Sequence, residues 1–143
     1  LVLAADTDVV LDGEILGKPV DAPHAVAMLR RLRGREHQVL TAVVLADLLT
    51  GRQWETLVSS RVLIRTLSDG EIDCYVATGE PLDKAGGYAI QGEAASMVHR
   101  VDGCYTNVVG LPICATRDLL MEAGVAPVTG VGCVDPQGRP CPR

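Results

Sequence analysis

The sequence predicts an α/β domain, with α+β as the alternative, in which helices flank a mixed sheet. Two observations carry this prediction. Segments rich in Val, Leu and Thr alternate along the chain with segments of helical period. The 143 residues are 48% hydrophobic but only 3% aromatic, and Phe is absent, so we expect an aliphatic core. Because the second set of strands follows a helix, the sequence disfavours a purely parallel sheet.

The first elements are expected to be a strand pair and a helix. Residues 1–11 form an apolar run that ends at Asp12-Gly13, a dipeptide typical of tight turns, and residues 14–16 then form a short return strand. Asp21 is a suitable N-cap, and the helix after it carries apolar residues at helical spacing until Gly34 stops it.

The middle of the chain predicts a hairpin and a second helix. Residues 37–47 and 53–66 are rich in β-branched and aliphatic residues, and a loop with Gly51 joins them. Ser68 and Glu71 have the spacing of a capping box, which opens a helix that Gly79 closes.

After a glycine-bearing segment, 79–92, the pattern indicates a strand pair, a final helix and a tail. We expect strands over 96–101 and 104–109, turned by Asp102-Gly103. A helix should run from about residue 112 to 123, before Gly124. We therefore assign a domain to residues 1–124 and a poorly ordered tail, rich in Pro and Gly, to residues 125–143.

Charge and hydropathy disfavour nucleic-acid and membrane partners. The net charge is −5, and the basic run at residues 30–35 is interpreted as the solvated end of a helix rather than a nucleic-acid surface. No apolar run reaches the roughly 20 residues of a spanning helix. Residues 1–5 lack the features of a signal peptide, so we expect a cytoplasmic protein.

The five cysteines do not form a recognised metal or disulfide pattern. Their number is odd and no C-x-x-C pair occurs, which argues against a zinc knuckle. Cys74, Cys104 and Cys114 are expected to pack as small hydrophobic residues. A disulfide between Cys133 and Cys141 is an alternative that a reducing cytosol disfavours.

The opening strand carries the first candidate site residues. Asp6 interrupts an apolar strand, where a carboxylate is costly unless it is paired, exposed or bound to a metal. Asp8 should share its face, which gives either a carboxylate pair for a divalent cation or a solvated face. Thr7 is either a ligand contact or a β-branched strand residue.

Two lysines beside glycines suggest a phosphate site. Lys18 lies in Leu-Gly-Lys-Pro and Lys84 in Leu-Asp-Lys-Ala-Gly-Gly, where small residues would let a ligand approach closely. Asp83 would orient Lys84, bind a cation or cap a turn. The amide of Gln91 can read a base edge or satisfy a backbone group. Neither a Walker loop nor a G-x-G-x-x-G motif is present, so the residues alone indicate no more than a candidate phosphate site.

An ordered set of motifs resembles the Maf family of nucleoside triphosphate pyrophosphatases, which are historically linked to inhibition of septum formation. The resemblance extends from residue 1 to about residue 124. The motifs that carry it are Ala5-Asp6-Thr7, Leu16-Gly17-Lys18-Pro19, Gly34-Arg35, Leu67-Ser68-Asp69, the run from Tyr75 to Pro81, Asp83-Lys84-Ala85-Gly86, the run from Tyr88 to Gly92, and the run from Asn107 to Pro112.

The resemblance implies a cytoplasmic, usually dimeric enzyme that depends on Mg²⁺ or Mn²⁺. It would cleave dTTP, UTP or modified nucleotides to a monophosphate and pyrophosphate, on a fold similar to inosine triphosphate pyrophosphatases. Asp6 matches the proton-accepting aspartate, and the metal ligands stay open, with Asp6 and Asp83 as candidates. Lys18 and Lys84 match phosphate-region lysines, and Thr7 and Gln91 match positions tied to base choice.

Two features depart from the family pattern. A Ser-x-Ser-Pro-Arg-Arg-like phosphate-binding loop is absent before Asp6, so we expect an N-terminally truncated copy. Asp8 stands where the family has an apolar residue. The alternative function is therefore a truncated nucleotide-binding or division-associated domain that does not catalyse.

Overall fold

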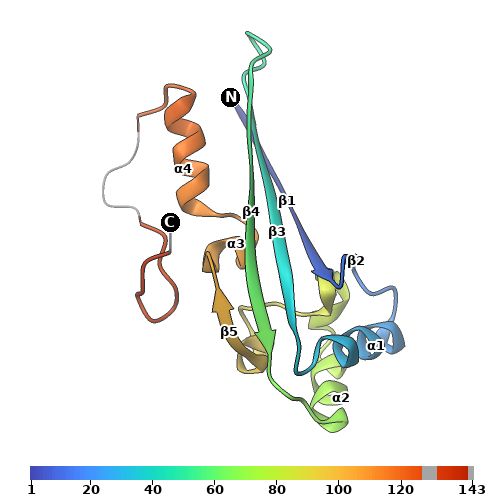
Figure 1. Ribbon diagram of the computed structural model, residues 1–143. Helices are drawn as coiled ribbons and strands as arrows, with labels where there is room; N and C mark the ends of the chain where they lie inside the picture. Colours follow the sequence, from blue (N-terminus) through green and yellow to red (C-terminus); the bar gives the residue numbers. More distant parts are fainter. Residues whose placement is uncertain (127–131, 142–143) are drawn as a thin grey trace. The chain divides into compact units, whose positions relative to one another are not determined.

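The computed structural model describes residues 1–126 and 132–141. Within them the strands form a five-stranded sheet in the order β2-β1-β3-β4-β5 (Figure 1). The strands are β1 (Val2–Leu11), β2 (Glu14–Leu16), β3 (Glu36–Ala46), β4 (Gln53–Ile64) and β5 (Val98–Asp102). The α-helices are α1 (Ala22–Leu32), α2 (Asp69–Ala77), α3 (Tyr105–Val109) and α4 (Ile113–Glu122). Short 3-10 helices are η1 (Glu80–Asp83), η2 (Ala85–Gly87) and η3 (Glu93–Met97).

The α/β class with flanking helices is confirmed, and the structure specifies the strand directions. β1 pairs antiparallel with β2, and β4 pairs antiparallel with β5. β3 and β4 form the expected long hairpin, whose loop is closed by the Asp47 N–H, which donates to the Arg52 carbonyl at 2.9 Å. The sheet is antiparallel, which corrects the expectation of a mixed sheet.

The chain divides into two compact units. The first unit comprises Leu1–Thr7, Leu40–Ser60 and Gly103–Arg143. The second unit comprises Asp8–Val39 and Arg61–Asp102.

The second unit begins with the predicted tight turn. Asp12 and Gly13 both have positive φ, 53° and 80°, which is the requirement of a type I′ hairpin turn. The turn sets the β1–β2 register, in which Leu11 pairs with Glu14.

Helix α1 begins and ends as the sequence predicts. The Asp21 carboxylate accepts the His24 N–H at 2.8 Å, which satisfies one of the first N–H groups of the helix. Its buried residues recur three to four positions apart, so that they form one face: Ala25, Met28, Leu29 and Leu32. Helices α1 and α2 lie side by side (Figure 1).

The basic run at residues 30–35 begins in the last turn of α1 and forms the exposed end of that helix, as predicted. Its arginines form ion pairs with nearby carboxylates on other elements of the unit. These pairs are Arg30 and Arg33 with Asp69, Arg31 with Glu14, and Arg35 with Asp12.

Helix α2 opens with the predicted capping box. The Ser68 hydroxyl accepts the Glu71 N–H at 3.2 Å, and Glu71 Oε2 accepts the Ser68 N–H at 2.7 Å. The Ser68 N–H, followed by Arg65 and the Ser68 hydroxyl, lowers the pKa of Glu71 to about 2. The helix buries Ile72, Tyr75 and Val76.

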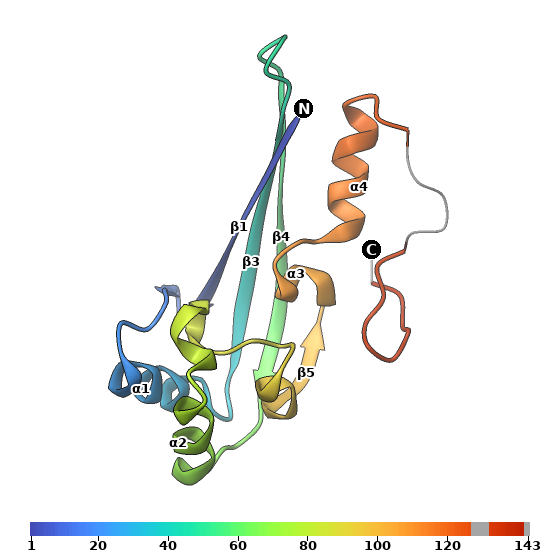
Figure 2. The same ribbon diagram turned by 180° about the vertical axis from the view of Figure 1, so that it is seen from behind.

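The predicted strand pair 96–101 and 104–109 is wrong. β5 pairs instead with β4, where Val62 faces Val101, and residues 105–109 form helix α3 (Figure 2). The local sequence pattern does not reveal that the backbone at Gly103 lies close to Ser60. A Cβ at Gly103, which has φ of +125°, would lie only 2.8 Å from Ser60 Oγ. The chain therefore turns at Gly103 and enters a helix.

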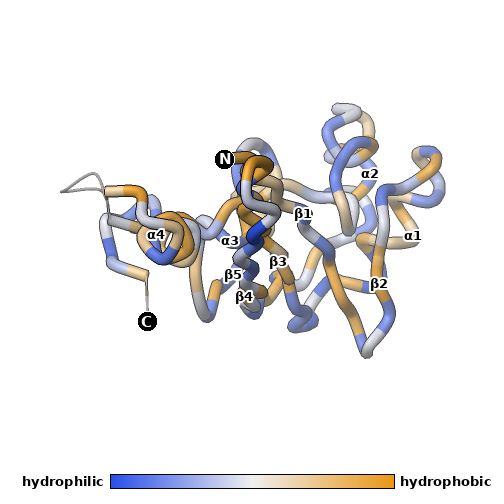
Figure 3. The backbone as a smooth tube through the Cα atoms, turned by 90° about the horizontal axis from the view of Figure 1, so that it is seen from above, coloured by the Kyte–Doolittle hydropathy of each residue, from blue (hydrophilic) through white to orange (hydrophobic). Residues whose placement is uncertain are grey.

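In the first unit, the final helix follows the prediction. α4 starts after Pro112 and stops before Gly124, which has φ of +85°. The first residues of β1 are hydrophobic, as the colour of the tube at the N-terminus shows (Figure 3). They are nevertheless exposed, with Val2 48% exposed.

The predicted tail lies partly outside the described residues. Residues 127–131 and 142–143 are not described. Between them, residues 132–141 form a turn in which an isolated bridge pairs Val134 with Pro140 (Figure 2). In the described part of the chain, none of the helices has the length and apolar character needed to cross a membrane.

Candidate functional site

Two loops of the second unit bring three charged candidates together. The Gly86 N–H donates to the Gly17 carbonyl at 3.1 Å, which joins the two loops. Lys84 Nζ lies 2.7 Å from Asp83 Oδ2. The hydrogen bond from Lys84 lowers the pKa of Asp83, and the charge of Lys18 acts in the same direction. Lys18, Asp83 and Lys84 therefore form one group, which we call the lysine–aspartate group.

Glycines shape the segment that carries Lys84, but their role differs from the one expected. Gly86 and Gly87 have φ of +73° and +72°, and a Cβ at Gly86 would lie 3.0 Å from the Val9 side chain. A Cβ at Gly92 would collide with the Glu80 carboxylate. Packing and backbone conformation therefore account for these glycines without a ligand.

Gln91 is exposed at the end of this segment, next to a buried anchor. Tyr88 is buried, and its hydroxyl lies 2.6 Å from Nε2 of the buried His37. Burial lowers the pKa of His37 to about 4, so this imidazole is neutral near pH 7. The anchor holds the backbone before Gln91, while the amide itself faces outward.

In the first unit, Asp6 and Thr7 have different environments. Asp6 is exposed, and its Oδ1 accepts the Thr7 N–H at 3.0 Å. Thr7 is half-buried, and its Oγ1 lies 2.9 Å from Thr41 Oγ1. Thr41 donates its single hydroxyl proton to the Asn107 carbonyl at 3.0 Å. Thr7 must then be the donor to Thr41, so its hydroxyl can only accept from a ligand.

The sequence reasoning missed the polar residues buried beneath Thr7. Asn107 Nδ2 donates to Ser60 Oγ at 3.0 Å, and Ser60 Oγ donates to the Cys104 carbonyl at 3.0 Å. Thr41, Ser60 and Asn107 are all buried. The available signal was a set of polar residues inside apolar stretches. Buried polar groups are retained only when they are hydrogen-bonded.

The candidate residues thus fall into two sets. The second unit holds the lysine–aspartate group and Gln91, and the first unit holds Asp6 and Thr7. Asp8, in β1, is half-buried. The convergence of Asp6 with the two lysines on one cleft stays a prediction.

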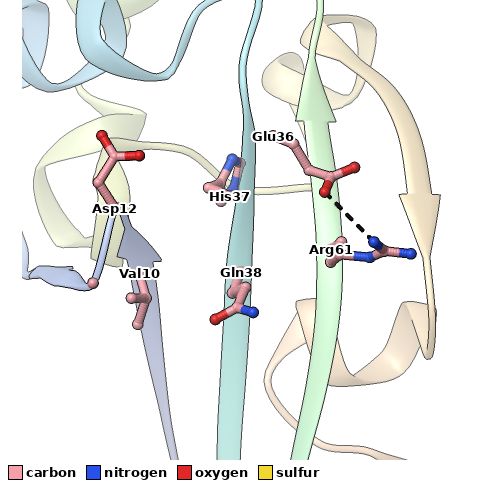
Figure 4. A pocket seen from close by; sticks show the side chains of 7 residues that line it. Val10, Asp12, Glu36, His37, Gln38 and Arg61 are labelled. Carbon is pink, nitrogen blue, oxygen red and sulfur yellow. Dashed lines mark ion pairs between the residues drawn. The ribbon is translucent and has the colours of Figure 1, made fainter.

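A pocket in the second unit does not contain the predicted site residues. It has a volume of about 260 Å³, and its lining residues are Val10, Asp12, Gly13, Glu36, His37, Gln38 and Arg61 (Figure 4). In this lining, Glu36 Oε1 lies 3.8 Å from Arg61 Nη1. Two carboxylates in the lining repel anions, so this pocket does not suit a triphosphate.

The candidate metal ligands are hard oxygen donors. Among the described residues, the carboxylates and imidazoles do not assemble into a preformed metal cluster. Mg²⁺ commonly takes one or two carboxylates and completes its shell with substrate phosphates and water. The carboxylates of Asp6 and Asp83 fit this mode of binding.

The cysteines depart from the prediction. Cys74 is exposed and Cys114 is half-buried, so neither packs as a core residue. Cys104 is buried, but it lies with Cys133 and Cys141 rather than in an apolar setting.

Comparison with known proteins identifies the class to which this α/β domain belongs. The family description "Maf-like protein" matches residues 1–123. The chain belongs to the Maf-like protein family, as its motifs predict.

Curated relatives share about half of their matched residues with this chain. A dTTP/UTP pyrophosphatase of Nitrosomonas europaea is 54% identical over 125 residues, which cover 87% of this chain and 59% of that protein. One of Pelotomaculum thermopropionicum is 48% identical, with coverage of 87% and 65%. One of Escherichia coli O157:H7 is 54% identical, with coverage of 83% and 59%. The chain thus spans less than two thirds of the length of these relatives.

Proposed function

We propose that this chain is part of an enzyme that hydrolyses dTTP or UTP to a nucleoside monophosphate and pyrophosphate. The observation that carries the proposal is the agreement between the relatives' activity and the chemistry of the lysine–aspartate group. Relatives named for this activity share about half of their matched residues with the chain.

The two lysines would bind the phosphates. A triphosphate carries several negative charges, and cationic groups held in place stabilise the further charge that develops as pyrophosphate leaves. The contact of 2.7 Å between Asp83 and Lys84 supports a positioning role for Asp83.

Asp6 would act as the general base. Water attacks the α-phosphorus, the bond from this phosphorus to the bridging oxygen breaks, and pyrophosphate departs with the bonding electrons. Asp6 accepts the proton that the water loses. Its exposure in this chain is compatible with access by substrate.

A divalent cation, Mg²⁺ or Mn²⁺, would be held by Asp6 or Asp83 together with the substrate phosphates. When bound, such an ion offsets phosphate charge and acidifies a coordinated water.

The Thr7 hydroxyl would contribute to base choice. Since its proton is committed to Thr41, its oxygen can only accept, and the ring N3–H of thymine or uracil is a donor. Cytosine has an acceptor nitrogen at that ring position. Two acceptors, this nitrogen and the Thr7 oxygen, would then face each other without a proton between them. Gln91 would read a second polar group of the base through its amide.

A homodimer and a cytoplasmic location are implied by the family resemblance and belong to this proposal. The alternative is a domain that binds nucleotide without hydrolysing it. The same set of measurements distinguishes the two functions.

The test measures pyrophosphate release from dTTP, UTP and CTP with Mg²⁺ or Mn²⁺. We expect turnover of dTTP and UTP but little turnover of CTP, and Asp6→Asn should lower kcat by about 10²–10⁴-fold. Asp73→Asn is the matched control, because this exposed aspartate of α2 is not among the candidate site residues.

Calorimetry with dTTP supplies the second readout. Binding without turnover would reject the hydrolase in favour of the binding domain. Equal rates for Asp6→Asn and Asp73→Asn would remove Asp6 from the mechanism.

A further inference from the structure

Three cysteine side chains from two parts of the first unit lie together. Their Sγ atoms are all within 4.8 Å of one another, and the Sγ atoms of Cys104 and Cys133 are 3.3 Å apart. Cys104 and Cys133 are buried, and Cys141 is half-buried. We call Cys104, Cys133 and Cys141 the thiol cluster.

A short turn fixes two members of the cluster beside each other. The Cys141 N–H donates to the Cys133 carbonyl at 2.8 Å. Between them, the Asp135 carboxylate accepts the N–H groups of Gln137 and Arg139 at 3.0 and 2.8 Å. The backbone therefore presents both thiols on one side of the turn, facing Cys104 at the start of α3.

Apolar burial does little to hold this turn in place. Within residues 132–141, Cys133 is the buried residue and Val134 is 49% exposed. Burial of one small side chain removes little apolar surface from water and so contributes little to stability. Metal binding contributes directly to the stability of a folded segment, because a preformed site is absent from the unfolded chain.

We propose that Cys104, Cys133 and Cys141 bind a thiolate-preferring metal ion, of which Zn²⁺ is the representative, and that an exogenous ligand such as water takes the fourth position. Tetrahedral Zn²⁺ with Zn–S bonds of about 2.3 Å requires sulfur–sulfur distances of about 3.8 Å. The separations in the cluster, from 3.3 Å to at most 4.8 Å, bracket this value. Soft thiolate ligands favour Zn²⁺ over Mg²⁺.

A neighbouring hydroxyl would support the ligands. Thr106 Oγ1 lies 2.9 Å from Cys133 Sγ and 3.2 Å from Cys104 Sγ, and it accepts the Ile113 N–H at 3.1 Å. Its proton can then be donated to a thiolate, which is the usual kind of outer contact around a metal ligand. A disulfide, by contrast, would use two of the sulfurs and leave the third without a role.

The family match covers Cys104 but not the other two members of this cluster. It ends at residue 123, so Cys133 and Cys141 lie beyond it. The cluster shares no residue with the set assigned to nucleotide hydrolysis, so the two proposals can fail independently.

The test uses the reduced 143-residue chain, stripped of metal by a chelator and titrated with Co²⁺ as a spectroscopic probe. We expect one Co²⁺ per chain, with a thiolate-to-cobalt charge-transfer band, tetrahedral visible bands and displacement by Zn²⁺. Loss of an outer contact alone lowers metal affinity about 10–100-fold, so Cys133→Ser and Cys141→Ser should each lower it by about 100-fold or more. Thr106→Val removes only an outer contact and should lower the Co²⁺ affinity by about 10–100-fold.

Cys74→Ser and Cys114→Ser are the matched controls and should bind Co²⁺ like the parent chain. Cys141 is the deciding position, because it is half-buried and its replacement disturbs packing least. Absence of the charge-transfer band in the reduced parent chain would overturn the proposal. So would equal affinities for Cys141→Ser and the controls, or a Cys104–Cys133 disulfide found by mass spectrometry in protein kept with glutathione and Zn²⁺.

Discussion

The two units of the molecule are stabilised by different kinds of buried side chains. The second unit buries aliphatic residues from several elements, for example Leu29, Leu32, Ile64 and Ile72. In the first unit, polar groups and thiols take a large part in the interior. Of the five buried polar residues described, four belong to it: Thr41, Ser60, Asn107 and Thr116.

The two kinds of buried side chain have different effects on the fold. Aliphatic burial is non-directional and depends on area and packing. The hydrogen bonds of Thr41, Ser60 and Asn107 require partners with suitable geometry, so these buried groups fix positions as well as adding stability. We therefore expect the second unit to be sensitive to cavities and the first unit to be sensitive to lost hydrogen bonds.

The largest expected effect on stability is a cavity in the second unit. Ile72→Ala removes a side chain that is 0% exposed in α2 and should lower the free energy of unfolding by about 2–5 kcal/mol. Urea denaturation measures this change. Ile15→Ala, at a position 61% exposed in β2, is the control and should change it by at most about 0.5 kcal/mol. Equal effects at the two positions would mean that the aliphatic core is not the source of stability.

The next effect is a pH dependence from His37, the buried polar residue of the second unit. Burial lowers its pKa from 6.5 to about 4, so the unfolded chain binds a proton between these values while the folded chain does not. The free energy of unfolding should therefore rise with pH through this window, by roughly 3 kcal/mol in all. Denaturation at a series of pH values measures the slope.

A histidine variant isolates that slope from the carboxylates. His37→Gln should flatten it between about pH 5 and 6.5, because Glu71, with a pKa of about 2, titrates lower. His99→Gln, at an exposed position, should retain it. If the slope persists in His37→Gln, another group is responsible.

The elements that the sequence predicted well are those whose determinants are local. The N-cap at Asp21, the capping box of Ser68 and the turn at Asp12-Gly13 each depend on residues within four positions. The second strand pair failed because its outcome depends on distant partners. β4 pairs with β5, and Ser60 lies against Gly103. A pattern within residues 96–109 contains neither fact.

The candidate site shows the same division. Lys18, Asp83 and Lys84 lie in one group, and the phosphate site that their glycine-containing contexts suggest stays a prediction. The glycines themselves turned out to serve packing against Val9 and Glu80. The thiol cluster was not predicted, because its ligands are 29 and 8 positions apart and have no signature in a short window. Only the fold of the first unit brings them together.

The smallest of the expected effects concerns the hydrogen-bonded interior of the first unit. Ser60→Ala removes the acceptor of Asn107 Nδ2 and the donor to the Cys104 carbonyl, while it changes little volume. It should lower the free energy of unfolding by about 1–3 kcal/mol, because buried polar groups lose a partner. Ser59→Ala, at the exposed neighbouring position of β4, is the matched control.

Ser60→Ala also tests whether the buried polar groups position the Thr7 hydroxyl or only stabilise the fold. The Asn107 carbonyl accepts the hydrogen bond of the Thr41 hydroxyl, and Thr41 in turn fixes the Thr7 hydroxyl. A shift of α3 should therefore reach Thr7. We expect the preference for dTTP over CTP to fall in Ser60→Ala while Ser59→Ala retains it. A loss of stability without any change in base preference would show that these buried polar groups support the fold alone, and the contrast between the two units would then be one of packing chemistry only.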